Sequence, residues 1–125
     1  MPGKKKKQPD DNLSEVIIEA MLDKKAKDPV SLKFSTLDNS VCDEFIICHG
    51  SSRPQVEAIA DNVLSEVKNK TGMNSWHKEG FENAEWILID YNDIVVHIFL
   101  DSRRAFYNLE QLWADAEIRH YDQQE

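Results

Sequence analysis

The side chains best suited to chemistry are carboxylates and serines beside predicted strand ends. Gly50-Ser51 precedes a predicted helix, where backbone amides could hold a phosphate. Metal-dependent phosphoryl transfer also needs carboxylates that converge on Mg²⁺, normally two residues apart on one strand face. Asp43-Glu44 are adjacent and point to opposite faces, while Asp90 and Asp93 lie on either side of a turn. No Asp-x-Asp or Asp-x-Glu pair lies on the strand after the Gly-Ser loop, so the sequence disfavours a catalytic metal site.

The histidines and serines also lack a catalytic or metal-binding pattern. His97 lies in the middle of a predicted strand beside aromatic residues, where we expect it to hydrogen-bond locally or touch a partner. His49, His77 and His120 have no Cys or His neighbours at ligand spacing. Ser51-Ser52 lie outside any Gly-x-Ser-x-Gly elbow and are expected to cap the helix. We therefore predict no catalytic residue, no metal and no cofactor.

The charge of the chain favours a basic protein partner. The net charge is −8, and four lysines, Lys4 to Lys7, stand at the start. From residue 10 onward, 11 basic residues stand against 23 acidic ones, a net charge of −12. An acidic body repels phosphate backbones, so we expect little direct nucleic acid contact by the folded domain.

The sequence predicts neither a membrane span nor a secretory signal. No run approaches the roughly 18 apolar residues that a span needs. The lysine-rich start leads into Pro9-Asp10-Asp11 instead of an apolar stretch, so we expect a cytoplasmic protein. Cys42 and Cys48 would lie about 20 Å apart in a strand, too far for a disulfide, and are expected to be reduced and buried.

Three helices and five strands are predicted to position these side chains. The strands are Val30 to Phe34, Phe45 to Cys48, a weak one from Asn74 to Lys78, Glu85 to Asp90, and Ile94 to Leu100. The first helix should run from Leu13 to Lys27, and the second from about Pro54 to Thr71. The third should begin at Asp101 or Ser102 as its cap and bury Phe106, Leu109, Leu112 and Trp113.

This αββαβββα order predicts an α/β fold with helices packed against a mixed sheet. We expect a single domain over residues 12–116, with a flexible lysine-rich tail at 1–11 and a polar tail at 117–125.

The strongest pattern is a hairpin with two unlike faces. With Asn92 and Asp93 as the loop, Ile87 lies opposite Ile98 on an aliphatic face that should meet the helices. The other face should point outward. On it, Asp90 should lie opposite Val95, Leu88 opposite His97, and Trp86 opposite Phe99. Exposed aromatics with acidic neighbours are typical of a protein-binding site. The alternative is that Trp86 and Phe99 are covered by a loop or by a second copy of the chain.

The same hairpin carries a resemblance to a known family. Glu85 to Phe99 and the following stretch from Arg103 to Trp113 resemble the Iojap/RsfS signature. Upstream, Asp43 to Ser52 and Val56 to Asp61 are similar to the family's central strand and helix. The resemblance covers roughly residues 13 to 116, and several linked motifs are far more specific than one.

The resemblance implies a nucleotidyltransferase-like topology and a ribosomal silencing factor. Such a factor binds ribosomal protein L-fourteen on the large subunit and obstructs joining of the small subunit when nutrients are scarce. Family contact positions carry over to Trp86 and to Tyr91, and Tyr91 departs from the aliphatic residue that some members have. The expected binding residues are Trp86, Leu88, Asp90, Tyr91, Asp93, His97 and Phe99. A homodimer away from the ribosome is a further expectation, and nucleotidyl transfer is the alternative function.

Overall fold

The first helix ends, and the first strand begins, earlier in the sequence than the pattern predicted. The computed structural model describes residues 9–34 and 42–121, with side chains described from Leu13 onward, so residues 1–8 of the expected tail lie outside it. Helix α1 spans Pro9–Asp23, not Leu13 to Lys27. It ends early because Lys25 takes a left-handed backbone (φ 62°) and the Ala26 N–H donates to the Met21 carbonyl. Strand β1, Lys27–Lys33, then begins at once.

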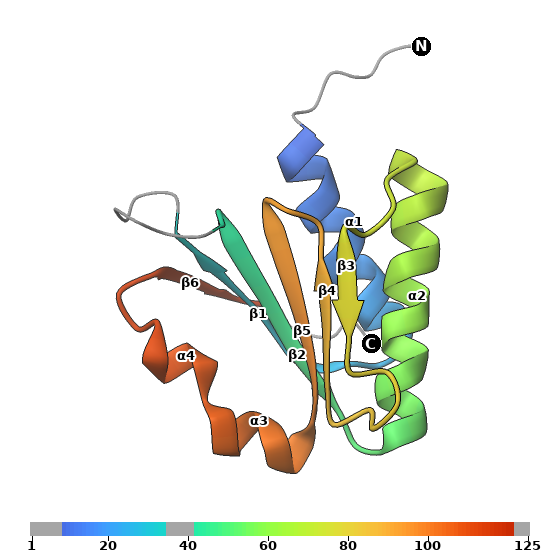
Figure 1. Cartoon of the computed structure of the whole chain (residues 1–125). Coiled ribbons are helices and arrows are strands. Elements are labelled where there is room, and N and C mark those ends of the chain that lie inside the picture. The colour runs from blue at the N-terminus through green and yellow to red at the C-terminus, as the bar shows by residue number, and fades with distance from the viewer. Residues whose placement is uncertain (1–8, 35–41, 122–125) are drawn as a thin grey trace.

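The sheet is mixed, as predicted, and has six strands in the order β3-β4-β5-β2-β1-β6 (Figure 1). β2 and β5 pair in parallel at its centre, and the other neighbours are antiparallel. The remaining strands are β2 Glu44–Gly50, β3 His77–Glu79, β4 Trp86–Asp90, β5 Ile94–Leu100 and β6 Glu117–His120. The apolar run of β2 is buried on both faces, which suits its central place.

Helices α1 and α2 cover one face of the sheet (Figure 1). Helix α2 spans Arg53–Thr71; the Ser52 hydroxyl caps it by accepting the Gln55 N–H, and Gly72 ends it at φ 79°. The predicted helix and serine cap are therefore confirmed. Its buried stripe joins the aliphatic side chains of β4 and β5 in the larger core, which contains Val56, Ile59, Val63, Ile87, Ile89, Val96 and Ile98.

The third predicted helix is two short helices on the opposite face of the sheet (Figure 1). α3 spans Asp101–Tyr107 and α4 spans Leu109–Leu112, with Asn108 between them at φ 49°. This left-handed residue resets the helical phase, so Trp113 packs on the sheet while Phe106 and Leu112 are 71% and 70% exposed. Their predicted burial is wrong. Neither Asp101 nor Ser102 caps α3, whose cap position is Leu100 with no side-chain hydrogen bond.

Residues 117–120 form edge strand β6, where the sequence predicted part of a polar tail. β6 pairs with β1, from Val30 opposite His120 to Lys33 opposite Glu117. All four side chains are exposed, so the sequence has no apolar alternation there that would predict a strand. Its stability comes from backbone pairing with a distant segment, which side-chain pattern does not record.

Two further properties bear on the expectations. Cys42 and Cys48 are free thiols and buried, as predicted. Within residues 9–34 and 42–121, no helix combines the length and apolar character that crossing a membrane requires.

Candidate protein-binding face

The β4–β5 hairpin has the predicted register. Ile87 lies opposite Ile98, and Trp86 lies opposite Phe99. The turn closes where the Tyr91 N–H donates to the Ile94 carbonyl at 2.9 Å. Alternation along each strand therefore separates an aliphatic face under α1 and α2 from the mixed face, as predicted.

The mixed face is less open than predicted. Phe99 is fully buried and His97 is 4% exposed. The Tyr107 ring, carried by α3, packs 4.6 Å from the Trp86 ring and 6.1 Å from the Phe99 ring, measured between centroids. A partner therefore cannot touch Phe99, which lies under Tyr107 of α3, and His97 is buried between the Phe45 and Trp86 rings. The expectation that both side chains lie open is wrong.

His97 serves the structure of this face. Its Nδ1 accepts a hydrogen bond from Trp86 Nε1 at 3.0 Å, so the ring proton lies on Nε2. Burial lowers the pKa of His97 to about 4. Its ring also packs against Phe45, with 4.5 Å between centroids. The imidazole is thus neutral and holds the Trp86 indole in one orientation.

Tyr91 lies on the helix side of the hairpin and is only 3% exposed. Burial raises the pKa of its phenol to about 12, and the hydroxyl has no hydrogen-bond partner among the described residues. The partner contact expected of Tyr91 is therefore not available to this side chain in the folded chain.

An apolar strip remains accessible beside the buried aromatics. Trp86 and Leu88 of β4 and Val95 of β5 are half-buried. Tyr107 continues the strip from α3 at 43% exposure, and Phe106 packs edge-on against it at 5.1 Å between centroids. We call these five residues the apolar face. It brings together two of the predicted binding residues, Trp86 and Leu88, with three that the prediction did not include.

Phe106 and Tyr107 could have been recognised from one signal in the sequence. They are adjacent on a helix, where neighbouring side chains diverge by about 100° and cannot both face one core. The tertiary contact of Tyr107 with Trp86, however, depends on where α3 lies, and no local pattern gives that.

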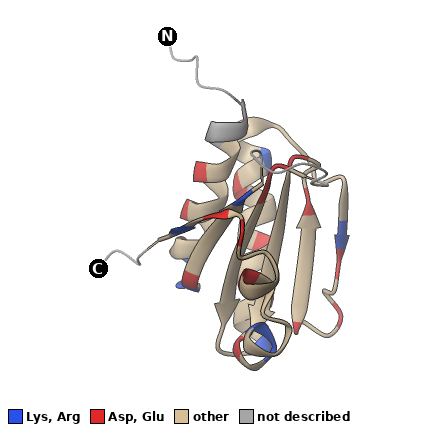
Figure 2. Cartoon of the chain, turned by 90° about the vertical axis from the view of Figure 1, so that its left-hand side faces the viewer, with Lys and Arg blue, Asp and Glu red and all other residues tan. Residues whose placement is uncertain are grey.

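Acidic side chains border the apolar face at the hairpin turn. Asp93 is exposed and Asp90 is half-buried. Asp90 Oδ1 accepts the Asn92 N–H at 2.7 Å, and Asn92 turns the chain at φ 80°. Figure 2, viewed from the side of α3 and α4, shows acidic residues on helices, strands and loops and fewer basic ones. This end of the face therefore suits a basic partner.

Two of the groups considered for phosphoryl transfer are engaged by the chain itself. The Ser51 N–H, which could hold a phosphate, donates to Gln55 Oε1 at 2.7 Å. Glu44 is 5% exposed and accepts a hydrogen bond from the Ser14 hydroxyl. Within the part of the chain that the structure describes, no three His, Cys, Asp or Glu side chains are grouped to hold a metal.

Comparison with known proteins gives one family. The model described as "Ribosomal silencing factor during starvation" matches residues 6–125. The ribosomal silencing factor of Halalkalibacterium halodurans is 44% identical over 104 residues, covering 83% of this chain and 87% of that protein. That of Bacillus subtilis is 41% identical over 100 residues, covering 80% and 83%.

The fold leads to the same family. A crystal structure of a protein from Chromobacterium violaceum superposes with a TM-score of 0.78 at 38% identity, covering 83% of this chain and 85% of that one. The matched segment includes the hairpin, the central strands and the helices described above. The chain therefore belongs to the RsfS family of ribosomal silencing factors.

Proposed function

We propose that this chain binds ribosomal protein L-fourteen on the large ribosomal subunit and obstructs joining of the small subunit. Bound there, it represses translation when nutrients are limited, and it acts in the cytoplasm. Its relatives are named ribosomal silencing factors, which supports the general role. The partner and the obstruction are the finer parts of the proposal.

The observation that carries the proposal is the apolar face with its acidic end. Trp86, Leu88 and Tyr107 offer accessible aromatic and aliphatic surface of the kind that supplies most binding energy at interfaces. Asp90 and Asp93 lie at the turn of the same hairpin, where they would speed encounter with a basic ribosomal protein. The apolar anchors of β4 and α3 thus lie beside the acidic steering groups at the hairpin turn.

Obstruction requires no covalent step, so we propose a regulatory factor and not an enzyme. The Ser51 amide that could have held a phosphate is occupied by Gln55, which supports this choice. Incubating the full chain with nucleotide and Mg²⁺ tests the alternative of nucleotidyl transfer directly. Turnover of nucleotide together with failure to bind large subunits would favour the enzyme.

A pull-down with purified ribosomal protein L-fourteen tests the partner. Trp86→Ala should weaken binding at least tenfold, about 1.4 kcal/mol, because it removes the central aromatic of the face. It will also lower the melting temperature, since Trp86 stacks on Phe99 at 5.1 Å between centroids. The folded fraction of each protein is therefore measured at the assay temperature.

The control for that pull-down is Asn69→Ala, an exposed change on α2 at the other layer of the molecule. It should bind like the unmodified chain. Full binding by folded Trp86→Ala would overturn the assignment of this face. The same face is also where we propose that a second copy binds away from the ribosome, and light scattering over a concentration series would detect that dimer.

A further inference from the structure

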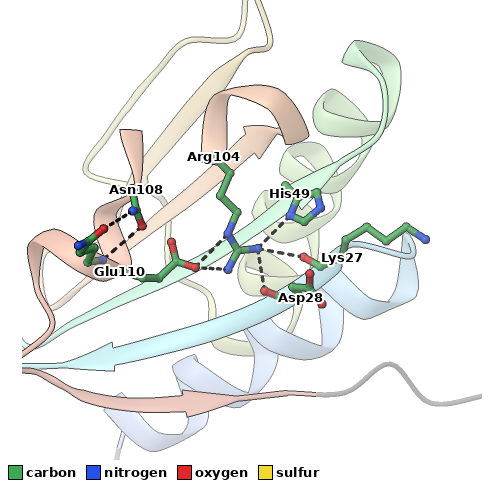
Figure 3. Close-up of polar contacts among 7 residues, drawn as sticks. Lys27, Asp28, His49, Arg104, Asn108 and Glu110 are labelled. Atoms are coloured by element: carbon green, nitrogen blue, oxygen red, sulfur yellow. Dashed lines mark hydrogen bonds and ion pairs between the residues drawn. The ribbon is translucent and has the colours of Figure 1, made fainter. Parts of the chain in front are cut away.

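Arg104 is a buried arginine on α3, 9% exposed, whose guanidinium connects α3 with three other elements (Figure 3). Its Nε and Nη2 both donate to Glu110 Oε2 of α4, at 3.1 and 2.6 Å. The Glu110 carboxylate is itself mostly buried, with 27% of its side chain exposed. This charge-assisted contact ties α4 to α3 across the break at Asn108.

The third nitrogen of Arg104 reaches the irregular start of β1. Nη1 donates to the Asp28 carbonyl at 2.8 Å and lies 3.4 Å from that of Lys27. The pairing of β1 with β2 shifts register between Lys27 and Val30, and Asp28 has φ 49°. A bulge of this kind disrupts the hydrogen-bond ladder of the sheet, and Arg104 donates to the carbonyls at that point.

The same nitrogen also contacts the end of β2. Nη1 lies 3.0 Å from His49 Nδ1, and since a guanidinium can only donate, His49 must accept there. Burial, followed by the nearby Arg104 charge, lowers the pKa of His49, which favours the neutral ring that this contact needs. Arg104 thus joins α4, the β1 bulge and the β2 end through one side chain.

What these contacts hold in place is helix α3, which contributes Phe106 and Tyr107 to the apolar face. Tyr107 lies three residues after Arg104 on α3, and the Asn108 N–H donates back to the Arg104 carbonyl at 2.8 Å. We propose that Arg104 is a positioning residue for partner binding, because it fixes α3 and α4 on the sheet and thereby keeps Tyr107 packed on Trp86. This inference rests on the proposed function of the apolar face.

The test replaces Arg104 with lysine, which keeps the charge but cannot donate in three directions from one planar group. Hydrogen exchange of the full chain should rise at least tenfold in residues 105–113 of Arg104→Lys and stay unchanged in α1 and α2. Binding to large subunits should weaken about fivefold or more. The matched control is Arg103→Lys, since Arg103 has a side chain 42% exposed and bonds only to Glu85 among the described contacts; it should change neither measurement.

A double-variant cycle separates positioning from general stability. If Arg104 acts through Tyr107, Arg104→Lys should cause no further loss of binding once Tyr107→Ala is present. Glu110→Gln keeps an acceptor oxygen but loses the charge, so it should raise hydrogen exchange in residues 105–113 less than Arg104→Lys does. This variant replaces Arg104→Lys in the test if Arg104→Lys does not fold. Unchanged hydrogen exchange in residues 105–113 would overturn the proposal. So would a double variant whose loss of binding equals the product of the two single-variant losses.

Failure of the proposed function would look different. In that case the unmodified chain would not bind large subunits at all. The positioning of Tyr107 by Arg104 would still be decided by the exchange measurements, which need no partner.

Discussion

The two faces of β4 should respond differently to the same truncation at neighbouring residues. Leu88 is half-buried on the apolar face, whereas Ile89 is fully buried under α1 and α2. Each change to alanine removes about three carbon groups, worth roughly 0.8 kcal/mol each when fully buried. Because Leu88 is only half-buried, Leu88→Ala should cost about 1 kcal/mol of stability and about 1 kcal/mol more of binding. Ile89→Ala also leaves a cavity and should cost roughly 2–5 kcal/mol of stability.

Thermal melting and binding to large subunits measure the two effects separately. For a domain of this size, 1 kcal/mol corresponds to about 4 °C, so Ile89→Ala should melt about 8–20 °C lower and Leu88→Ala only about 4 °C lower. Binding by the folded protein should weaken about fivefold for Leu88→Ala and stay unchanged for Ile89→Ala. The reasoning is refuted if the two variants melt alike, or if Ile89→Ala weakens binding as much as Leu88→Ala does.

Two further predictions concern charge and pH. Replacing Asp90 and Asp93 together with asparagine should slow association with large subunits and reduce its salt dependence, measured by stopped flow. Glu57→Gln with Asp61→Asn makes the same charge change on α2 and should slow it far less; equal slowing by both pairs would contradict a steering role for the hairpin. In the folded chain His97 has a pKa of about 4, so between pH 6.5 and pH 4 it stays neutral while the unfolded chain binds a proton there. Stability should therefore fall as the pH is lowered from 6.5 towards 4. At pH 5 the loss in the free energy of unfolding amounts to roughly 2 kcal/mol. Urea unfolding at pH 7 and pH 5 should show that the unmodified chain loses this much more stability than a His97→Gln variant. Equal losses in the two proteins would exclude His97 as the source.

The hairpin could be predicted from sequence because its determinants are local. Asn92 suits the positive φ of a tight turn, and the alternation on either side fixes which residues share a face. The burial of Ile87 and Ile98 follows directly from that register. The three candidate residues at the outward positions of β4, Trp86, Leu88 and Asp90, were found for the same reason.

The sequence left both an open and a covered face possible, because the burial of Phe99 and His97 depends on where α3 and β2 place Tyr107 and Phe45. Arg104 contacts carbonyls more than 70 residues earlier in the chain, and this contact helps to place α3 on the sheet. Nothing in the pair Arg103-Arg104 tells which side chain is buried. The strand at 117–120 was missed for a similar reason, since its partner β1 lies far away in sequence.

Subunit joining in a purified system tests the central claim most directly. Large subunits are incubated with the full chain, small subunits are then added, and the mixture is separated on a sucrose gradient. The account predicts that the subunits stay apart and that the chain migrates with the large subunit, while folded Trp86→Ala restores joining. Normal joining in the presence of the chain, or a chain that remains at the top of the gradient, would contradict it.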